Sequence, residues 1–264
     1  MQASLLEYFP ETNGDGLNVS WAHAVNSKGR LAAALRSQVM VLEADISMST
    51  NSRFPVPIMA HPPAATSDIT LEEWLHEAIP HNKGLKLDFK TTEVVEPACR
   101  VLARVAEQIR GPLILNADIL PGPNNPITPP VDAWTFLTLC RTRFPRSVIS
   151  IGWTTCSEVV EVMPGGCIKL GLTREQIDKM ISLVKEYSLM QPVMFPVWVA
   201  HLKYSVPEVQ RLLFQVPSSS LMAWCHKGDP VTLEDLLMIR KAFHVSQVFY
   251  DLPDDFLQHF YSIT

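Results

Sequence analysis

The sequence predicts an α/β fold, a single (β/α)8 barrel of the TIM type formed by residues 1–264. Eight short apolar runs with the composition of β-strands alternate with longer segments of helical periodicity, as in repeated strand–helix units around a parallel sheet. The chain has 264 residues, which is close to the usual length of such a barrel. GxGxxG and GxxxxGK[ST] sequences, common in open nucleotide-binding sheets, are absent, and an open doubly wound sheet is therefore the less favoured alternative.

The expected elements follow one another in strict alternation. Strands are expected at residues 19–23, 39–46, 85–90, 113–118, 147–152, 193–199, 220–225 and 247–251. Helices are expected at residues 28–38, 70–79, 93–110, 131–143, 173–190, 206–214, 232–243 and 254–261. Three helices have start signals in which a threonine precedes an acid or amide by three residues: Thr70 with Glu73, Thr173 with Gln176 and Thr232 with Asp235.

Composition limits the class of protein. The chain carries 22 basic and 27 acidic side chains, a net charge of −5, which argues against a nucleic-acid binder that depends on overall positive charge. The longest apolar stretch, residues 193–200, is too short to span a membrane. The amino terminus lacks a basic segment and its apolar run is interrupted at Glu7, so no signal peptide is expected and the expected location is intracellular. Five cysteines without a CxxC pair predict reduced thiols.

Charged residues gather on one face of two neighbouring strands. Alternate residues of a strand share a face, so Glu43 and Asp45 point together, as do Lys86, Asp88 and Lys90. The opposite faces are aliphatic and must pack against helices, which leaves the charged faces inside the barrel. Because unpaired buried charge costs several kcal/mol, a barrel without a site would avoid this arrangement. The pattern indicates an active site at the carboxyl ends of the strands, where such barrels place their chemistry.

These side chains have the chemistry of a metal and phosphate site. Glu43, Asp45 and Asp88 offer hard oxygen ligands suited to one divalent cation, Mg²⁺ or Ca²⁺, and Lys86 and Lys90 suit a phosphate.

Two histidines are candidates for acid and base groups at the same site. His23 at the end of the first strand and His61 in the segment IMAHP could exchange protons near neutral pH. Each pattern also has a structural interpretation on its own: a solvated strand face, a loop histidine or an internal ladder of salt bridges. Because these residues occur together at the ends of successive strands, a functional site is favoured over these structural interpretations.

Six further residues near strand ends are candidates for a substrate pocket. They are Asn116, Asp118, Trp153, His201, Trp224 and Asp251. Trp153 and Trp224 could line a pocket for a lipid or choline-like group, since aromatic faces attract cations, or could simply pack at the top of the barrel.

The order of histidine, ExD, histidine and D/ExK resembles the superfamily of phospholipase-C-like phosphodiesterases, in particular glycerophosphodiester phosphodiesterases and sphingomyelinase D. The segments WAHAVNS (21–27), LEADIS (42–47), AHPP (60–63) and LKLDFK (85–90) are similar to the menorin family, and this resemblance covers essentially the whole chain.

The superfamily resemblance implies a role for each matching residue. Glu43, Asp45 and Asp88 would hold one divalent ion, His23 and His61 would flank the scissile phosphodiester, and Lys90 would bind a phosphate oxygen. The chain departs from the glycerophosphodiesterase pattern because Ala24 and Val25 follow His23 where that family has Arg-Gly. It also has Asp88 where those enzymes have glutamate, although the sphingomyelinase D relatives use aspartate.

The predicted function is therefore a metal-dependent phosphodiesterase, a hydrolase or a cyclising lyase. Its expected partner is a small-molecule or lipid phosphodiester of the glycerophosphodiester or lysophospholipid type. The alternative is a catalytically inactive barrel that acts as a ligand-binding or adhesion protein with a protein partner, because menorin relatives act in extracellular adhesion and dendrite patterning. A third interpretation is a structural barrel with internal salt bridges and no metal. We expect a monomer, and related chains with secretion signals make a secreted location the alternative to an intracellular one.

Overall fold

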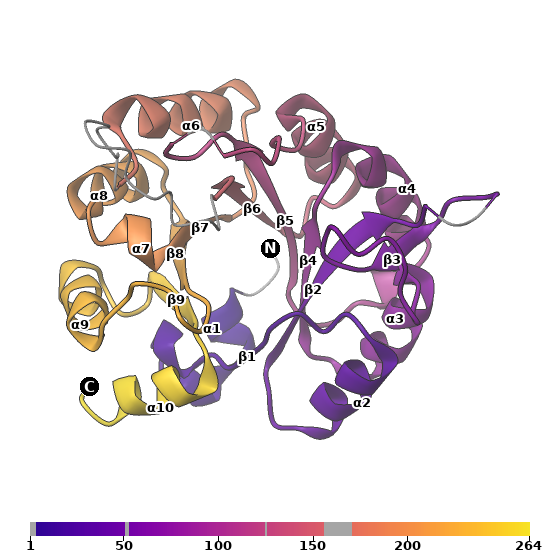
Figure 1. The fold of residues 1–264 in the computed structure, drawn as a ribbon, viewed down its shortest axis with the longest axis horizontal. Helices are drawn as coiled ribbons and strands as arrows, with labels where there is room; N and C mark the ends of the chain where they lie inside the picture. Colours follow the sequence, from indigo (N-terminus) through magenta and orange to yellow (C-terminus); the bar gives the residue numbers. More distant parts are fainter. Residues whose placement is uncertain (1–3, 51–52, 125, 156–170) are drawn as a thin grey trace.

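A computed structural model describes residues 4–50, 53–124, 126–155 and 171–264. Eight parallel strands in this part of the chain form a nearly closed ring with helices on its outer side (Figure 1). The ring strands are β1 (Trp21–Ala22), β2 (Val41–Met48), β4 (Gly84–Phe89), β5 (Leu113–Leu120), β6 (Val148–Trp153), β7 (Val193–Trp198), β8 (Ser219–Trp224) and β9 (Val248–Asp251). Each pairs with the next in this order, which confirms the predicted barrel.

The helices follow the predicted alternation. They are α2 (Lys28–Arg36), α3 (Leu71–Ala78), α4 (Thr92–Ala103), α5 (Ala133–Arg143), α6 (Arg174–Glu186), α8 (Val206–Gln215), α9 (Leu233–Ala242) and α10 (Asp254–Tyr261). The three predicted capping boxes at Thr70, Thr173 and Thr232 are confirmed, each with reciprocal side-chain and backbone hydrogen bonds.

Two predicted helices are too long. The helix expected over residues 93–110 ends at Ala103, because the next amides bond three residues back, Arg104 to Val101 and Val105 to Leu102. The helix expected over residues 173–190 ends at Glu186, since Ser188 has a φ of 47°, a left-handed conformation that a helix cannot continue through.

The sequence did not predict three short elements. These are α1 (Leu5–Tyr8), β3 (Pro57–Met59) and α7 (Val199–Leu202), each too short to show a period. Strand β3 pairs antiparallel with the end of β2, and the resulting hairpin projects from the ring (Figure 1). It carries the chain to His61, so this hairpin decides where that histidine lies.

Apolar residues form two separate cores. The larger one lies between sheet and helices and contains Leu42, Ala44 and Ile46 of β2. The smaller one includes alternate residues from five ring strands together with Leu5 and Phe9 near the amino terminus: Val41, Ile114, Met194, Met222 and Phe249. Leu5 of helix α1 therefore packs against inward-facing residues of the ring strands. The inward faces are thus apolar toward the amino ends of the strands, and the charged residues that follow on the same faces lie toward the carboxyl ends.

The seam between β1 and β9 is closed without a strand pairing in the described residues. The turn Gly16–Asn18 packs directly on the backbone of β9, where a Cβ on Gly16 would collide with the carbonyl oxygen of Val248. The Gly16 amide also donates a 2.9 Å hydrogen bond to the carbonyl of Val245. Across this seam, His23, which follows β1, lies beside Asp251 at the carboxyl end of β9.

Cys99, Cys140 and Cys225 are free and buried, as predicted for reduced thiols, whereas Cys156 and Cys167 lie outside the described residues. No described helix combines the length and apolar character needed to cross a membrane.

Candidate functional site

Three carboxylates meet at the carboxyl-terminal rim, the ring of residues at and just beyond the carboxyl ends of the strands. Glu43 and Asp45 extend from β2 and Asp88 from β4, and one oxygen of each lies within 4.8 Å of the others. The strand register places Asp45 directly beside Asp88. All three are almost fully buried, with exposed fractions of 1%, 4% and 9%. The structure therefore brings together the three predicted metal ligands. Among the described residues, this is the one cluster of three acidic, histidine or cysteine side chains close enough to share a metal ion.

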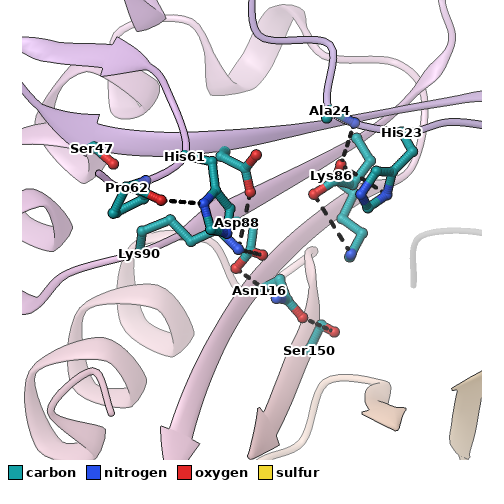
Figure 2. A network of polar contacts seen from close by, with 12 residues as sticks. His23, Ala24, Ser47, His61, Pro62, Lys86, Asp88, Lys90, Asn116 and Ser150 are labelled. Carbon is teal, nitrogen blue, oxygen red and sulfur yellow. Dashed lines mark hydrogen bonds and ion pairs between the residues drawn. The ribbon is translucent and has the colours of Figure 1, made fainter. Parts of the chain in front are cut away.

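Two lysines stand beside these acids, Lys86 almost fully buried and Lys90 partly buried, and both are drawn in Figure 2. The Lys90 Nζ lies 2.6 Å from Asp88 Oδ2 and 3.0 Å from Asp45 Oδ1. Lys86 is deeper in the barrel, with its Nζ 3.9 Å from Glu43 Oε1. Burial opposes the charged form of both lysines, but the surrounding carboxylates outweigh it and raise the pKa of each. Both ammonium groups therefore stay charged inside the barrel.

The segment after β1 fixes the two acids of β2. Asn26 donates from Nδ2 to Asp45 Oδ2 at 2.6 Å and accepts from the Asp45 amide at 2.9 Å. The Ala24 amide donates to Glu43 Oε2 at 2.8 Å, and Ala24 takes a φ of 52°. The sequence did not identify Asn26 as a site residue, because a single asparagine in a loop belongs to no periodic pattern. Its role becomes visible only in its hydrogen bonds to Asp45 of the neighbouring strand β2.

Asp88 is fixed from the other side by β5 and β6. Asn116 Nδ2 donates to Asp88 Oδ1 at 2.7 Å, and the Ser150 hydroxyl donates to Asn116 Oδ1 at 2.5 Å (Figure 2). Asn116, predicted as a pocket residue, thus holds a carboxylate in this structure.

His23 is tied to two acids at the seam of the ring. Its Nδ1 lies 2.9 Å from Asp251 Oδ2 and 3.4 Å from Glu43 Oε2, and its side chain is 48% exposed. Burial disfavours the charged ring, but the hydrogen bond to Asp251 and the charges of Glu43 and Asp251 raise the pKa of His23 to about 9. The ring is therefore held by Nδ1 and protonated at neutral pH, with Nε2 as its second donor.

His61 is an exposed residue of the loop after β3. Its Nδ1 lies 2.6 Å from the carbonyl oxygen of Pro62. Because a carbonyl only accepts, this contact places a proton on Nδ1 and leaves Nε2 of the neutral ring as an acceptor. In the view of Figure 2, His61 is drawn near Asp88 and Lys90, whereas His23 is drawn near Ala24 and Lys86.

Asp118 is a fourth acid on this side of the rim. Burial, followed by the charge of Asp88, raises its pKa to about 7. Its Oδ1 occupies space left by Gly152 on β6, where a Cβ would come within 2.6 Å of that oxygen. The acids, lysines and amide from β2, β4 and β5 form what we call the charged half of the rim: Glu43, Asp45, Lys86, Asp88, Lys90, Asn116 and Asp118.

The aromatic half of the rim, defined as Trp198, His201, Trp224 and His226, lies at the ends of β7 and β8. The Trp198 and Trp224 rings stack with centroids 6.3 Å apart, and the His201 ring packs edge-on against Trp198 at 4.8 Å. Trp198 was not among the predicted residues, although it follows the same strand face as Met194. Trp153 is buried at the end of β6, and its assignment to a pocket stays a prediction.

The fold and these contacts define a class: a (β/α)8 barrel whose rim buries three carboxylates among lysines and histidines. The chain belongs to the menorin family, since residues 15–257 match the Menorin N-terminal domain. It is 40% identical over 254 residues to Protein FAM151B of Homo sapiens, a match that covers 94% of this chain and 89% of that protein.

Two solved structures share the general arrangement at low sequence identity. A protein assigned as a phosphonomutase from Burkholderia cenocepacia J2315 is 10% identical with a TM-score of 0.48, over 97% of this chain and 96% of that one. The 7,8-dihydropteroate synthase of Vibrio fischeri ES114 is 12% identical with a TM-score of 0.47, over 92% and 90%. At this level of similarity, neither protein's activity bears on this chain.

Proposed function

We propose that this barrel is a metal-dependent phosphodiesterase acting on a glycerophosphodiester or lysophospholipid-like substrate. One observation carries the proposal: three buried carboxylates within 4.8 Å of one another share a rim with two charged lysines and His23. The motif order shared with phospholipase-C-like phosphodiesterases supports the same activity.

The carboxylates fit a divalent cation by chemistry and by charge. Carboxylate oxygens are the ligands that Mg²⁺ and Ca²⁺ prefer. Burial raises the pKa of Glu43, and the charges of Asp45 and Asp88 raise it further, although Lys86 and His23 act in the opposite direction. The net rise comes from burial, which Lys86 and His23 offset only in part. A bound divalent ion, held by Glu43, Asp45 and Asp88, would favour the ionised form of these buried carboxylates.

When bound, the cation would offset negative charge that develops on the phosphate. The protein's own groups would do the rest. Lys90 would hold a phosphoryl oxygen, His23 would donate a proton from Nε2 to the departing oxygen, and His61 would accept one at Nε2 from the attacking hydroxyl or water. Asp251 keeps His23 oriented and charged through its bond to Nδ1.

The first experiment is calorimetric titration of the metal-stripped protein with Mg²⁺ and Ca²⁺. We expect one cation to bind to the wild type, no measurable binding to Asp45→Asn, and unchanged binding to the matched control Asp254→Asn, an exposed acid of α10. A wild-type protein that binds neither ion contradicts the proposal.

The second experiment tests turnover on a panel of glycerophosphodiesters and lysophospholipids. We expect His23→Ala combined with His61→Ala to abolish turnover and to leave cation affinity unchanged. Cation binding by a wild type that turns over no diester would instead favour the alternative, a ligand-binding or adhesion barrel. In that case, a cell-surface partner should bind the His23→Ala protein as well as the wild type.

A further inference from the structure

A further histidine of the rim, His226, lies on the loop between β8 and α9. The His226 ring packs edge-on against the His23 ring, with centroids 5.7 Å apart, and against the Trp224 ring at 5.1 Å. His226 is an exposed residue. The His226 ring therefore lies next to His23, on the side of that ring toward β8.

The loop holds this ring in place through one carboxylate. Asp229 Oδ2 accepts a hydrogen bond from the His226 amide at 2.7 Å and another from Trp198 Nε1 at 2.6 Å. Gly228 between them takes a φ of 91°, a conformation that favours glycine. Asp229 thus ties the end of β7 to the loop after β8 and fixes where the His226 ring emerges.

The ring nitrogens of His226 have no hydrogen bond within the described residues, although its backbone amide is used. Both nitrogens of this exposed ring are therefore accessible to a ligand at the rim. Partial burial and then the positive charge of His23 lower the pKa of His226, and His61 acts in the same direction, whereas Asp229 and Asp251 oppose it. The ring is therefore neutral at neutral pH and able both to donate and to accept.

We propose that His226 contacts the substrate directly, by a hydrogen bond from its imidazole to a phosphoryl oxygen of the group held at His23, with Asp229 as its positioning residue. The geometry supports this role because rings whose centroids lie 5.7 Å apart can both reach one phosphoryl group. This inference rests on the proposed function, since it assumes that a phosphodiester occupies the rim.

The test is an NMR titration of the histidine imidazoles with inorganic phosphate in the presence of Mg²⁺. The His226 signals are assigned with His226→Gln. We expect phosphate to shift the signals of both His23 and His226 and to leave those of His244, an exposed histidine bonded to Ser246, unchanged. His226→Gln should weaken phosphate binding about three- to tenfold, the effect of one lost hydrogen bond. Asp229→Asn should shift the imidazole signals of His226 in the free protein.

The matched control is His244→Gln, for which we expect phosphate affinity and cation affinity equal to those of the wild type. Cation affinity and unfolding temperature of His226→Gln should also equal those of the wild type, which shows that the variant folds. If phosphate shifts His23 but not His226, the inference is wrong and the proposed function stands. If phosphate shifts neither, both are wrong.

Discussion

The two halves of the rim are built on different physical principles. In the charged half, position comes from hydrogen bonds and ion pairs: Asp88 meets Lys90 and Asn116, and Asp45 meets Lys90 and Asn26. In the aromatic half, position comes from ring packing, as between Trp198 and Trp224, with a single carboxylate as anchor. Asp251 and His23 join the two halves at the seam.

This difference has an energetic reason. A buried charge is costly unless it is paired, so a charged side chain inside the barrel needs an oppositely charged or hydrogen-bonding side chain nearby. Stacked aromatic rings are stabilised by packing contacts and do not need a charged partner. We therefore expect substitutions in the charged half to cost more stability, and to depend more on pH, than substitutions in the aromatic half.

The largest effect is expected for Lys86→Met in the metal-free protein. The variant keeps most of the side-chain volume but leaves Glu43 buried beside Asp45 without its ammonium partner, which should cost about 3–5 kcal/mol of unfolding free energy. Denaturant unfolding measures this. Lys179→Met on the exposed face of α6 is the control, with an expected change within about 0.5 kcal/mol. A loss as small as that of the control would show that the charged half does not depend on its ion pairs.

A smaller and pH-dependent effect is expected for Asp118→Asn. The pKa of Asp118 is about 7 in the fold and 3.8 in its unperturbed state. The unfolded chain therefore releases this proton first, and ionisation of Asp118 destabilises the fold progressively from about pH 4 to pH 7. The shift corresponds to at most about 4 kcal/mol. Because Asp118 keeps some solvent exposure, we expect the variant to be more stable than the wild type by about 2 kcal/mol at pH 8, with the difference vanishing near pH 4.

Unfolding curves at several pH values test this prediction, with Asp254→Asn as the control that shows no such trend. A stability difference that instead grew toward low pH would mean that Lys90 stabilises Asp118 as a carboxylate.

In the aromatic half, Trp198→Phe should cost about 1 kcal/mol. The substitution keeps a ring against Trp224 but removes the 2.6 Å hydrogen bond from Nε1 to Asp229. Thermal or denaturant unfolding measures the loss, and Trp134→Phe, at a 66% exposed position of α5, should leave stability unchanged. A cost equal to that of Lys86→Met would abolish the contrast between the halves.

The smallest stability effect is expected at the seam, where Asp251→Asn weakens the partnership with His23. In the folded metal-free protein the pKa of His23 is about 9, above its unperturbed value of 6.5. The pair therefore stabilises the fold below about pH 6.5 and loses this contribution as the pH rises through 9. Because the ring is half exposed, we expect less than about 1 kcal/mol.

NMR gives a sharper measure of the same pair. The His23 imidazole should titrate near pH 9 in the wild type and closer to pH 6.5 in Asp251→Asn, with His244 in the same spectra as the internal reference. An unchanged midpoint in the variant would assign the raised pKa to Glu43 alone.

The sequence predicted the charged half far better than the aromatic half. Glu43, Asp45, Lys86 and Asp88 lie on strands, where alternation separates a charged face from an aliphatic one, and Lys90 directly follows β4. His226 and Asp229 lie on a loop that follows no period, and their importance comes from contacts with His23 and Trp198, residues distant along the chain. Of the two tryptophans named as pocket candidates, Trp153 and Trp224, only Trp224 belongs to the observed stack with Trp198, because sequence order does not say which rings meet.

The sequence by itself determined the barrel, its eight-strand order and the inward direction of the charged residues, because strand period, helix caps and the cost of buried charge act locally. Tertiary structure alone decided how the ring closes at Gly16, which asparagine holds Asp45, and that Asp251 lies against His23. These contacts join residues far apart in the chain, and their geometry exists only once eight strands have closed into a ring.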